Sequence, residues 1–377
     1  MNERFDVAVI GGGPTGTAAA IALARGGRSV AVLERSRYEH ARIGEVLPPV
    51  ARSPLIKLGV WGRFITEGHG SSPGILSAWG QDEPYENHFI FNPYGPGWHL
   101  DRRRFDAMLA LAAREAGASV CQGARVTSCV PAASRGWQVE FASNGGRNHL
   151  GVSFLVYATG RAGIAARWQG TKRISCDRLV GVVGYFPARS AGTRDDRQTL
   201  VEATENGWWY SARLPDSRLV VAYMTDADLL PKGRIPVSEY WQDQLERAPN
   251  TRFRTSGRMP GMSLRSFAAN SYRLDRVTGN NWLVAGDAAI ALDPLSSQGI
   301  YRALESGLLA ANAIESCLLG DPSALEEYAR WTQRSFDKYL SIRTVTYGRE
   351  QRWASSPFWQ RRQNRSDHAP YGGVQRY

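Results

Sequence analysis

The chain has 377 residues, a formal net charge of +11 and 43% hydrophobic residues. This composition is that of a globular protein long enough for about two packed lobes, and it excludes a largely disordered chain. The sequence enters an apolar strand within its first residues, and no apolar run approaches the ~18 residues of a membrane helix. We therefore expect a cytoplasmic protein without a membrane segment.

The basic excess is almost entirely arginine, because the chain has only four lysines. Two explanations stay open: genomic base composition, or a positive surface for an acidic partner or anionic substrate. No helix-turn-helix, zinc finger or arginine–aromatic repeat is evident, so a nucleic-acid partner is not expected. The four cysteines lack metal-ligand spacing, which predicts buried thiols and no metal site.

The first 34 residues predict a dinucleotide-binding βαβ unit, with strands at 5–10 and 29–33 around a glycine loop and a helix. Gly11 permits a tight turn, Gly13 lets the backbone approach a pyrophosphate, and Gly16 lets the helix pack on the strand. The helix N-terminus supplies N–H groups for the phosphates. Glu34 at the end of the second strand is placed to accept hydrogen bonds from a ribose.

Later segments favour a flavin over a nicotinamide cofactor. The run 42–49 contains one glycine and two prolines, which forces an extended path that can lie against an isoalloxazine ring. Arg102 lies at the start of a predicted helix that runs on through 107–116, where it either binds the pyrophosphate or is solvated. Val126 follows a predicted strand and would line the adenine, and 154–160 reads as a buried strand that ends in glycine.

A second signal lies about 270 residues further along the chain. A buried strand from Asn281 ends in Gly286 and Asp287, and open α/β sheets place ligands at such carboxyl ends. Asp287 can accept hydrogen bonds from the ribityl chain. The following segment, 293–300, opens a predicted helix that runs to about Cys317, and its N–H groups suit the flavin pyrimidine oxygen.

These motifs in this order resemble the flavoprotein monooxygenases of the aromatic hydroxylase and flavin-dependent halogenase superfamily, over roughly residues 1 to 345. The resemblance implies an α/β (α+β two-lobe) fold: a Rossmann-like FAD-binding lobe and an antiparallel-sheet substrate lobe. It also implies FAD as the cofactor. The residues assigned to FAD are Gly11, Gly13, Gly16, Glu34, Arg35, Arg42, Gly44, Arg102, Val126, Asp287, Pro294, Gln298, Gly299 and Ile300.

One departure from the family pattern separates the possible reactions. Halogenases of this family use a lysine beside the flavin, some thirty residues after the Gly44-Glu45 segment, whereas this chain has Ser77-Ala-Trp79-Gly80 there; Lys57 falls too early. The segment 207–215 resembles the halogenase Gly-Trp-x-Trp-x-Ile-Pro signature with altered spacing. The remaining features resemble the halogenase-like flavoproteins that mature tryptophylquinone enzymes. These include the lysine oxidase and glycine oxidase accessory flavoproteins and the peptidyl-tryptophan hydroxylase of quinohemoprotein amine dehydrogenase.

That resemblance implies an FAD-dependent monooxygenase that hydroxylates a tryptophan of a partner protein, the small subunit of a quinone-bearing amine dehydrogenase or oxidase. Reduced flavin and O2 would form a C4a-hydroperoxide that transfers oxygen to the indole. The reductant is NADH, NADPH or reduced flavin from a separate reductase. Three further functions stay open: a small-molecule aromatic hydroxylase, a halogenase, and a flavin-bound chaperone.

Aromatic residues are the candidates for the substrate pocket, because ring faces stack on an indole. His99, Trp208 and Trp209 are the catalytic-site candidates, with His99 as a possible proton shuttle. Trp79, Trp98 and Tyr210 are further candidates for the lining, and plain core packing is the alternative for each.

We predict that the FAD-binding lobe comprises 1–72, 100–176 and 277–345, and that the substrate lobe comprises 73–99 and 177–276. Residues 346–377 mix arginine with aromatic residues. They form either a loosely packed terminus or a docking tail for a partner.

Overall fold

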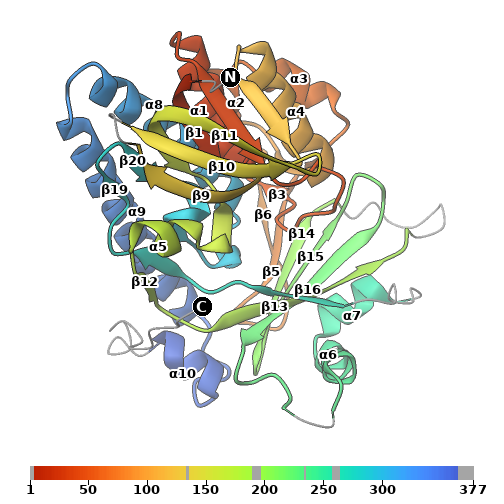
Figure 1. Ribbon diagram of the computed structural model, residues 1–377. Coiled ribbons are helices and arrows are strands. Elements are labelled where there is room, and N and C mark those ends of the chain that lie inside the picture. The colour runs from red at the N-terminus through yellow and green to blue at the C-terminus, as the bar shows by residue number, and fades with distance from the viewer. Residues whose placement is uncertain (1–3, 133–135, 189–196, 233–234, 257–263, 364–377) are drawn as a thin grey trace.

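The computed structural model describes residues 4–132, 136–188, 197–232, 235–256 and 264–363. Two large sheets dominate these residues, with an eight-stranded sheet in the upper part of Figure 1 and a seven-stranded sheet below it. Along the chain, strands alternate with helices only in the first of these two sheets. The result is the α/β fold that the sequence predicts.

The eight-stranded sheet contains a parallel core of β20, β11, β1, β2 and β8 in that order. β2, β20 and the carboxyl-terminal parts of β1 and β11 are runs of mostly apolar residues that are buried on both faces, as parallel strands between two layers must be, whereas the edge strand β8 is partly exposed. β9 and β10 extend β11 as an antiparallel ladder. The strands are β1 (Arg4–Ile10), β2 (Val30–Glu34), β8 (Ser119–Gln122), β9 (Arg125–Pro131), β10 (Trp137–Ser143), β11 (Gly146–Tyr157), β19 (Thr278–Gly279) and β20 (Trp282–Val284).

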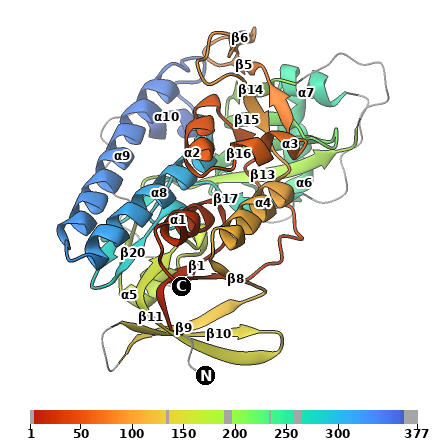
Figure 2. The same ribbon diagram turned by 90° about the horizontal axis from the view of Figure 1, so that it is seen from above.

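Helices α1 (Pro14–Arg25), α4 (Arg102–Glu115) and α8 (Gly299–Leu318) gather beside this sheet, with α1 between the other two (Figure 2). An added Cβ on Gly307 of α8 would overlap the backbone oxygen of Thr15, so these two helices are in close backbone contact. Helix α4 begins at Arg102, as predicted, because Asp101 caps it by accepting the N–H groups of Arg103 and Arg104.

The seven-stranded sheet has the order β17-β13-β16-β15-β14-β5-β6. Its neighbours are antiparallel as predicted, with the exception of β14 and β5, which are parallel. The strands are β5 (Gly74–Ala78), β6 (Tyr85–His88), β13 (Leu179–Phe186), β14 (Thr199–Thr204), β15 (Gly207–Arg213), β16 (Leu219–Asp226) and β17 (Arg265–Ala268). The exact lobe boundaries stay a prediction.

The two faces of this sheet have different neighbours. One face packs against Ile43, Val46 and Leu295 of segments that belong to the other half of the molecule. The opposite face packs under α6 (Val237–Glu246) through Trp241 and Leu245. α7 (Pro249–Thr255) follows α6 at the edge of the molecule (Figure 1). The first face is therefore the one that meets the predicted flavin region.

Short elements connect these layers. Two three-stranded sheets comprise β3 (Val46–Leu47), β4 (Gly70–Ser72) and β7 (Gly97–His99), and β12 (Arg173–Ser175), β18 (Tyr272–Leu274) and β21 (Ile290–Ala291). The remaining helices are α2 (Arg52–Lys57), α3 (Trp61–Thr66), α5 (Ile164–Gln169), α9 (Ser323–Gly348) and α10 (Pro357–Gln363). Among the described residues, no helix is both long enough and apolar enough to cross a membrane.

Residues 346–363 correct the expectation of a loosely packed terminus. Phe358 and Trp359 of α10 are fully buried against the seven-stranded sheet, and Trp359 Nε1 donates to the carbonyl oxygen of Thr204 at 3.0 Å. Arg362 pairs with the buried Asp226 at 2.6 Å. The aromatic residues of this segment complete a core rather than form a free tail. The rest of the predicted tail, 364–377, lies outside the described residues.

Candidate active site

The carboxyl ends of the parallel strands meet at one edge of the eight-stranded sheet. Gly11 follows β1, Glu34 ends β2, and Gly286 lies two residues after β20. The N-terminus of α1 opens at the same edge, and its N-cap residue Gly13 provides no side-chain cap. An added Cβ on Gly13 would meet nothing closer than Arg42 Nη1 at 4.0 Å, so the backbone N–H groups of this turn are approachable.

The glycines at this edge are required for different physical reasons. Gly11 has φ of +106°, and an added Cβ would overlap the backbone of Ala158. An added Cβ on Gly16 would overlap the carbonyl oxygen of Gly11, which agrees with the predicted close packing of helix on strand. Gly286 has φ of +62° and abuts Thr15 of α1. The glycines thus close the two strand ends onto α1, while Gly13 leaves space.

Glu34 is buried and holds the glycine loop in position. Its Oε2 accepts the backbone N–H of Gly12 at 2.7 Å, and its Oε1 accepts the Ser36 hydroxyl at 2.6 Å. Burial alone would raise the pKa of Glu34, but hydrogen bonds from Ser36 and Gly12 and the charge of Arg42 lower it below its usual value. Glu34 is therefore a buried carboxylate at the end of β2 that already accepts hydrogen bonds from Gly12, Ser36 and Arg42.

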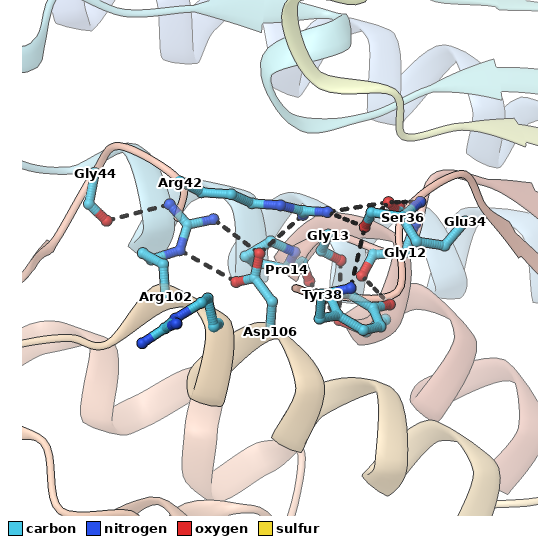
Figure 3. Close-up of polar contacts among 12 residues, drawn as sticks. Gly12, Gly13, Pro14, Glu34, Ser36, Tyr38, Arg42, Gly44, Arg102 and Asp106 are labelled. Atoms are coloured by element: carbon cyan, nitrogen blue, oxygen red, sulfur yellow. Dashed lines mark hydrogen bonds and ion pairs between the residues drawn. The ribbon is translucent and has the colours of Figure 1, made fainter. Parts of the chain in front are cut away.

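Two arginines converge on Asp106 next to the glycine loop (Figure 3). Arg42 donates to Asp106 Oδ2 at 2.9 Å and to Glu34 Oε1 at 3.0 Å. Arg102 donates to both oxygens of Asp106 at 3.1 Å and to the carbonyl oxygens of Ile43 and Gly44 at 2.8 and 3.2 Å. The side chain of Asp106 is fully buried, whereas Arg42 is 29% exposed. The two guanidinium groups are thus held at the α1 N-terminus, where an anionic group can reach them.

The second predicted segment lies at the same edge. Arg161, which follows β11, donates to the carbonyl oxygens of Asn270 and Leu292 at 2.7 and 2.8 Å. Its Nε lies 3.7 Å from Asp287 Oδ2. The Asp287 carboxylate stays 42% exposed, so it is accessible to a polar ligand.

Pro294, Gln298, Gly299 and Ile300 lie at the start of α8. Pro294 begins a 3₁₀ turn, and Gln298 is the N-cap residue. An added Cβ on Gly299 would meet no atom within 4 Å, so the N-terminus of α8 is open. The side chain of Ile300 is turned into the core, which leaves its backbone N–H as the group available to a ligand.

A hollow separates the Arg42–Arg102 region from the inner face of the seven-stranded sheet. Glu45, Arg42 and Arg102 line it from one side, and Tyr185 and Arg218 line it from the other, with Leu100 and Leu214 as apolar neighbours. Burial raises the pKa of Glu45, while Arg102 and the Tyr185 hydroxyl oppose this effect. Tyr210 of β15 lies close enough for Glu45 to raise the pKa of its hydroxyl further above its usual value, in addition to burial.

Trp208 and Trp209 do not share a pocket, which corrects the expectation that both line one. They alternate along β15 and point to opposite faces of the sheet. Trp209 packs on Tyr223 and Trp241 beneath α6, and Trp208 donates its N–H to Tyr347 at 2.9 Å. Both side chains are core residues in the described structure.

His99 also lies outside the hollow. It is 1% exposed, and its Nε2 pairs with the Thr199 hydroxyl at 2.9 Å. Burial, followed by the charge of Arg254, lowers the pKa of His99 to about 4, and a backbone hydrogen bond with Arg213 opposes the shift. With both ring nitrogens engaged, this imidazole does not fit the predicted proton shuttle. Trp79 and Trp98 are core residues as well: Trp79 donates to Thr346 O at 2.9 Å, and Trp98 packs on Trp61 and Phe64.

Two predicted cofactor residues lie apart from these contacts. Arg35 is exposed, and Val126 on β9 packs partly against the main core. Their roles stay predictions. Sequence reasoning missed Asp106 and Tyr38, whose hydroxyl donates to Gly12 O at 2.8 Å. The four-residue spacing from Arg102 to Asp106 on one helix was the available signal for the first.

The arrangement fits FAD. The approachable N–H groups at Gly13, the two guanidinium groups and the Glu34 carboxylate match a pyrophosphate and a ribose, and the open α8 N-terminus adds a second anion-attracting terminus. The family profile of the FAD binding domain matches residues 4–336. The chain belongs to this family, and it is an FAD-dependent oxidoreductase of the halogenase and aromatic hydroxylase group.

Relatives agree with this assignment. The chain is 30% identical over 369 residues to the FAD-dependent oxidoreductase LodB of Marinomonas mediterranea, covering 96% of this chain and 97% of LodB. It is 27% identical to a tryptophan 2-halogenase of Chondromyces crocatus, where the match covers 89% of this chain and 66% of the halogenase.

Solved structures share the fold. The myxobacterial chondrochloren halogenase CndH superposes with a TM-score of 0.87 at 26% identity, over 96% of this chain and 86% of CndH. The peptidyl tryptophan dihydroxylase QhpG, described as essential for tryptophylquinone cofactor biogenesis, superposes with a TM-score of 0.79 at 26% identity, over 96% of this chain and 79% of QhpG.

Proposed function

We propose that this protein is an FAD-dependent monooxygenase that hydroxylates a tryptophan side chain of a partner protein during tryptophylquinone biogenesis. The likeness to LodB over nearly the full length of both chains and the likeness to QhpG support this proposal. The partner is then the small subunit of a quinone-bearing amine dehydrogenase or oxidase.

One observation carries the choice of hydroxylation over halogenation. All four lysines of the chain, Lys57, Lys172, Lys232 and Lys338, are exposed, and none lines the hollow between the two sheets. The region where halogenases of this family have their lysine holds Ser77 on strand β5 and Trp79 just after it instead. A halide oxidised at the flavin would find no amine there to carry it to a ring.

FAD would be held by the turn at Gly11–Gly16, Glu34, Arg42 and Arg102, with Asp287 and the start of α8 on its other side; once reduced, it activates O2 for transfer to a ring. Residues of the chain itself bind the cofactor and shield the site from water. Leu214, which follows β15, and Leu100 add apolar surface to a hollow that charged side chains otherwise line, and this surface helps to keep water from an oxidising site. Electrons come from NADH, NADPH or the reduced flavin of a separate reductase.

The test is co-expression of a candidate quinone-enzyme subunit with this protein and without it, followed by intact mass measurement of the subunit. We expect a gain of one or two oxygen atoms that depends on this protein and maps to a tryptophan. A chlorine increment would show a halogenase. An unchanged mass with stable co-purification would show a chaperone, and oxygen insertion into free indoles alone would show a small-molecule hydroxylase.

A further inference from the structure

Two buried polar atoms near the hollow have no hydrogen-bond partner among the described residues: Oε1 of Glu45 and the hydroxyl of Tyr210. They come from different parts of the fold, since Glu45 precedes β3 and Tyr210 lies on the inner face of β15. Burying a polar atom without a partner costs roughly 1–3 kcal/mol, so such atoms are rare unless a ligand satisfies them.

The Glu45 carboxylate is held in place by its backbone. The N–H of Leu100 donates to Glu45 O at 2.7 Å, and Arg102 holds the two preceding carbonyl oxygens, those of Ile43 and Gly44. Gly44 has φ of +99°, a conformation that gives the chain a sharp turn before Glu45. Residue 45 is 4% exposed. This is a fixed, desolvated acceptor rather than a mobile surface carboxylate.

The hollow places polar groups beside a small apolar surface. Glu45, Tyr185 and further charged side chains supply the polar groups, while Leu100 and Leu214 supply the apolar surface; the other charged residues are Arg42, Asp101, Arg102, Arg103, Asp216 and Arg218. Burial, together with the nearby Glu45, raises the pKa of Tyr185 to about 12, so its hydroxyl stays neutral at ordinary pH. Tyr210 is neutral for the same reason. A donor on the ring that reaches Glu45 would therefore find its carboxylate beside neutral tyrosine hydroxyls.

We propose that Glu45 and Tyr210 form the receptor for the polar edge of the aromatic substrate, with the Glu45 carboxylate accepting a hydrogen bond from a ring N–H such as that of indole. This inference rests on the proposed function and names the group that orients its substrate. A ring anchored by its N–H has one fixed orientation in the hollow. The position of oxygen insertion is then set by the anchor and not by the reactivity of the ring alone.

The test compares two ligands that differ at the ring nitrogen. N-acetyl-L-tryptophanamide and its indole N-methyl derivative are titrated into the FAD-loaded protein by calorimetry. We expect the wild-type protein to bind the N–H compound ~10- to 100-fold more tightly, since a hydrogen bond to a charged group contributes about 1.5–3 kcal/mol. Glu45→Leu should abolish this preference, and Glu45→Gln, which keeps an acceptor, should retain part of it. Tyr210→Phe should weaken the binding of both compounds.

Glu202→Gln is the matched control. Glu202 is also buried, but it caps α7 by accepting the Thr251 N–H at 2.7 Å and lies on another strand, β14. It should leave the ligand preference unchanged, and FAD absorbance and circular dichroism verify the folding of every variant. An equal preference in wild type and Glu45→Leu would overturn the receptor and leave the proposed function standing. No binding of either compound to the wild type also contradicts the receptor, and the subunit mass experiment then decides the proposed function separately.

Discussion

Arg42 and Asp106 are joined by a 2.9 Å hydrogen bond although 64 positions separate them in the chain. The bond ties the extended run after β2 to the first turns of α4, beside the glycine loop (Figure 3). Because Asp106 also accepts from Arg102, this one buried carboxylate holds both guanidinium groups that face the predicted pyrophosphate position. Asp106 thus organises the site without having to contact the cofactor.

The first prediction concerns this carboxylate. Asp106→Asn removes the charged partner of Arg102 and one of the two carboxylates that pair with Arg42, so we expect a loss of about 1–3 kcal/mol in the free energy of unfolding and weaker FAD binding. Urea unfolding and FAD titration of the apoprotein measure the two effects. Asp216→Asn is the control, because Asp216 forms an exposed ion pair with Arg218. It should change stability by less than about 0.5 kcal/mol. Equal effects of both substitutions would contradict the organising role.

The second prediction compares two helical glycines. Gly16→Ala puts a methyl group into the carbonyl oxygen of Gly11, so we expect α1 to shift, FAD affinity to fall, and about 1–3 kcal/mol of stability to be lost. Gly62→Ala in α3 has no atom within 4 Å of the new methyl group. It should stabilise the protein by up to ~1 kcal/mol, because alanine favours helix. Thermal unfolding and flavin content measured in parallel test the pair, and unchanged flavin content in Gly16→Ala would contradict the close-packing argument.

Local patterns in the sequence predicted the parallel core and the cofactor edge, because these features depend on short motifs. Gly16 needs its small size and Glu34 ends a buried strand, and both facts can be read within 34 residues. The predicted order of apolar runs also placed β11 and β20 correctly as buried strands. The family profile and the structural relatives agree with that interpretation.

The polar contacts across the molecule could not be read in this way. Glu45, Tyr185 and Tyr210 come together only when the run after β2 packs on the inner face of the seven-stranded sheet. The prediction that Trp208 and Trp209 line one pocket was wrong for a related reason. Alternation along β15 sends Trp208 and Trp209 to opposite faces, and the partners that bury them lie on α6 and on α9, distant in sequence.

The third prediction concerns pH. Burial lowers the pKa of His99, and likewise that of His69, to about 4, below the ~6.5 of an unfolded histidine. The unfolded chain therefore binds protons that the folded chain does not between these values, and stability is fully present above about pH 6.5 and lost as the pH falls toward 4. Each histidine contributes a slope of up to about 1.4 kcal/mol per pH unit.

His99→Gln should flatten the fall in stability between pH 6.5 and 4, measured by urea unfolding at a series of pH values. The exposed His40 serves as the control, and His40→Gln should leave the profile unchanged. We also expect His99→Gln to keep oxygen transfer, because its contacts are with Thr199 and Arg213 and not with the hollow. Loss of turnover with an unchanged fold would restore the proton-shuttle role.

The fourth prediction tests whether the C-terminal segment belongs to the core. Arg362 is 1% exposed, donates to Asp226 at 2.6 Å, and lies over the Phe358 ring at 3.7 Å from its centroid. Arg362→Met leaves the buried Asp226 with Arg361 alone, so we expect a loss of about 2–4 kcal/mol in the free energy of unfolding. Adding Asp226→Asn should recover part of this loss, because the unpaired charge is then removed. Arg247→Met, which breaks an exposed pair with Asp243, should change stability by less than about 0.5 kcal/mol. If residues 346–363 were a loose docking tail, Arg362→Met would behave like this surface control.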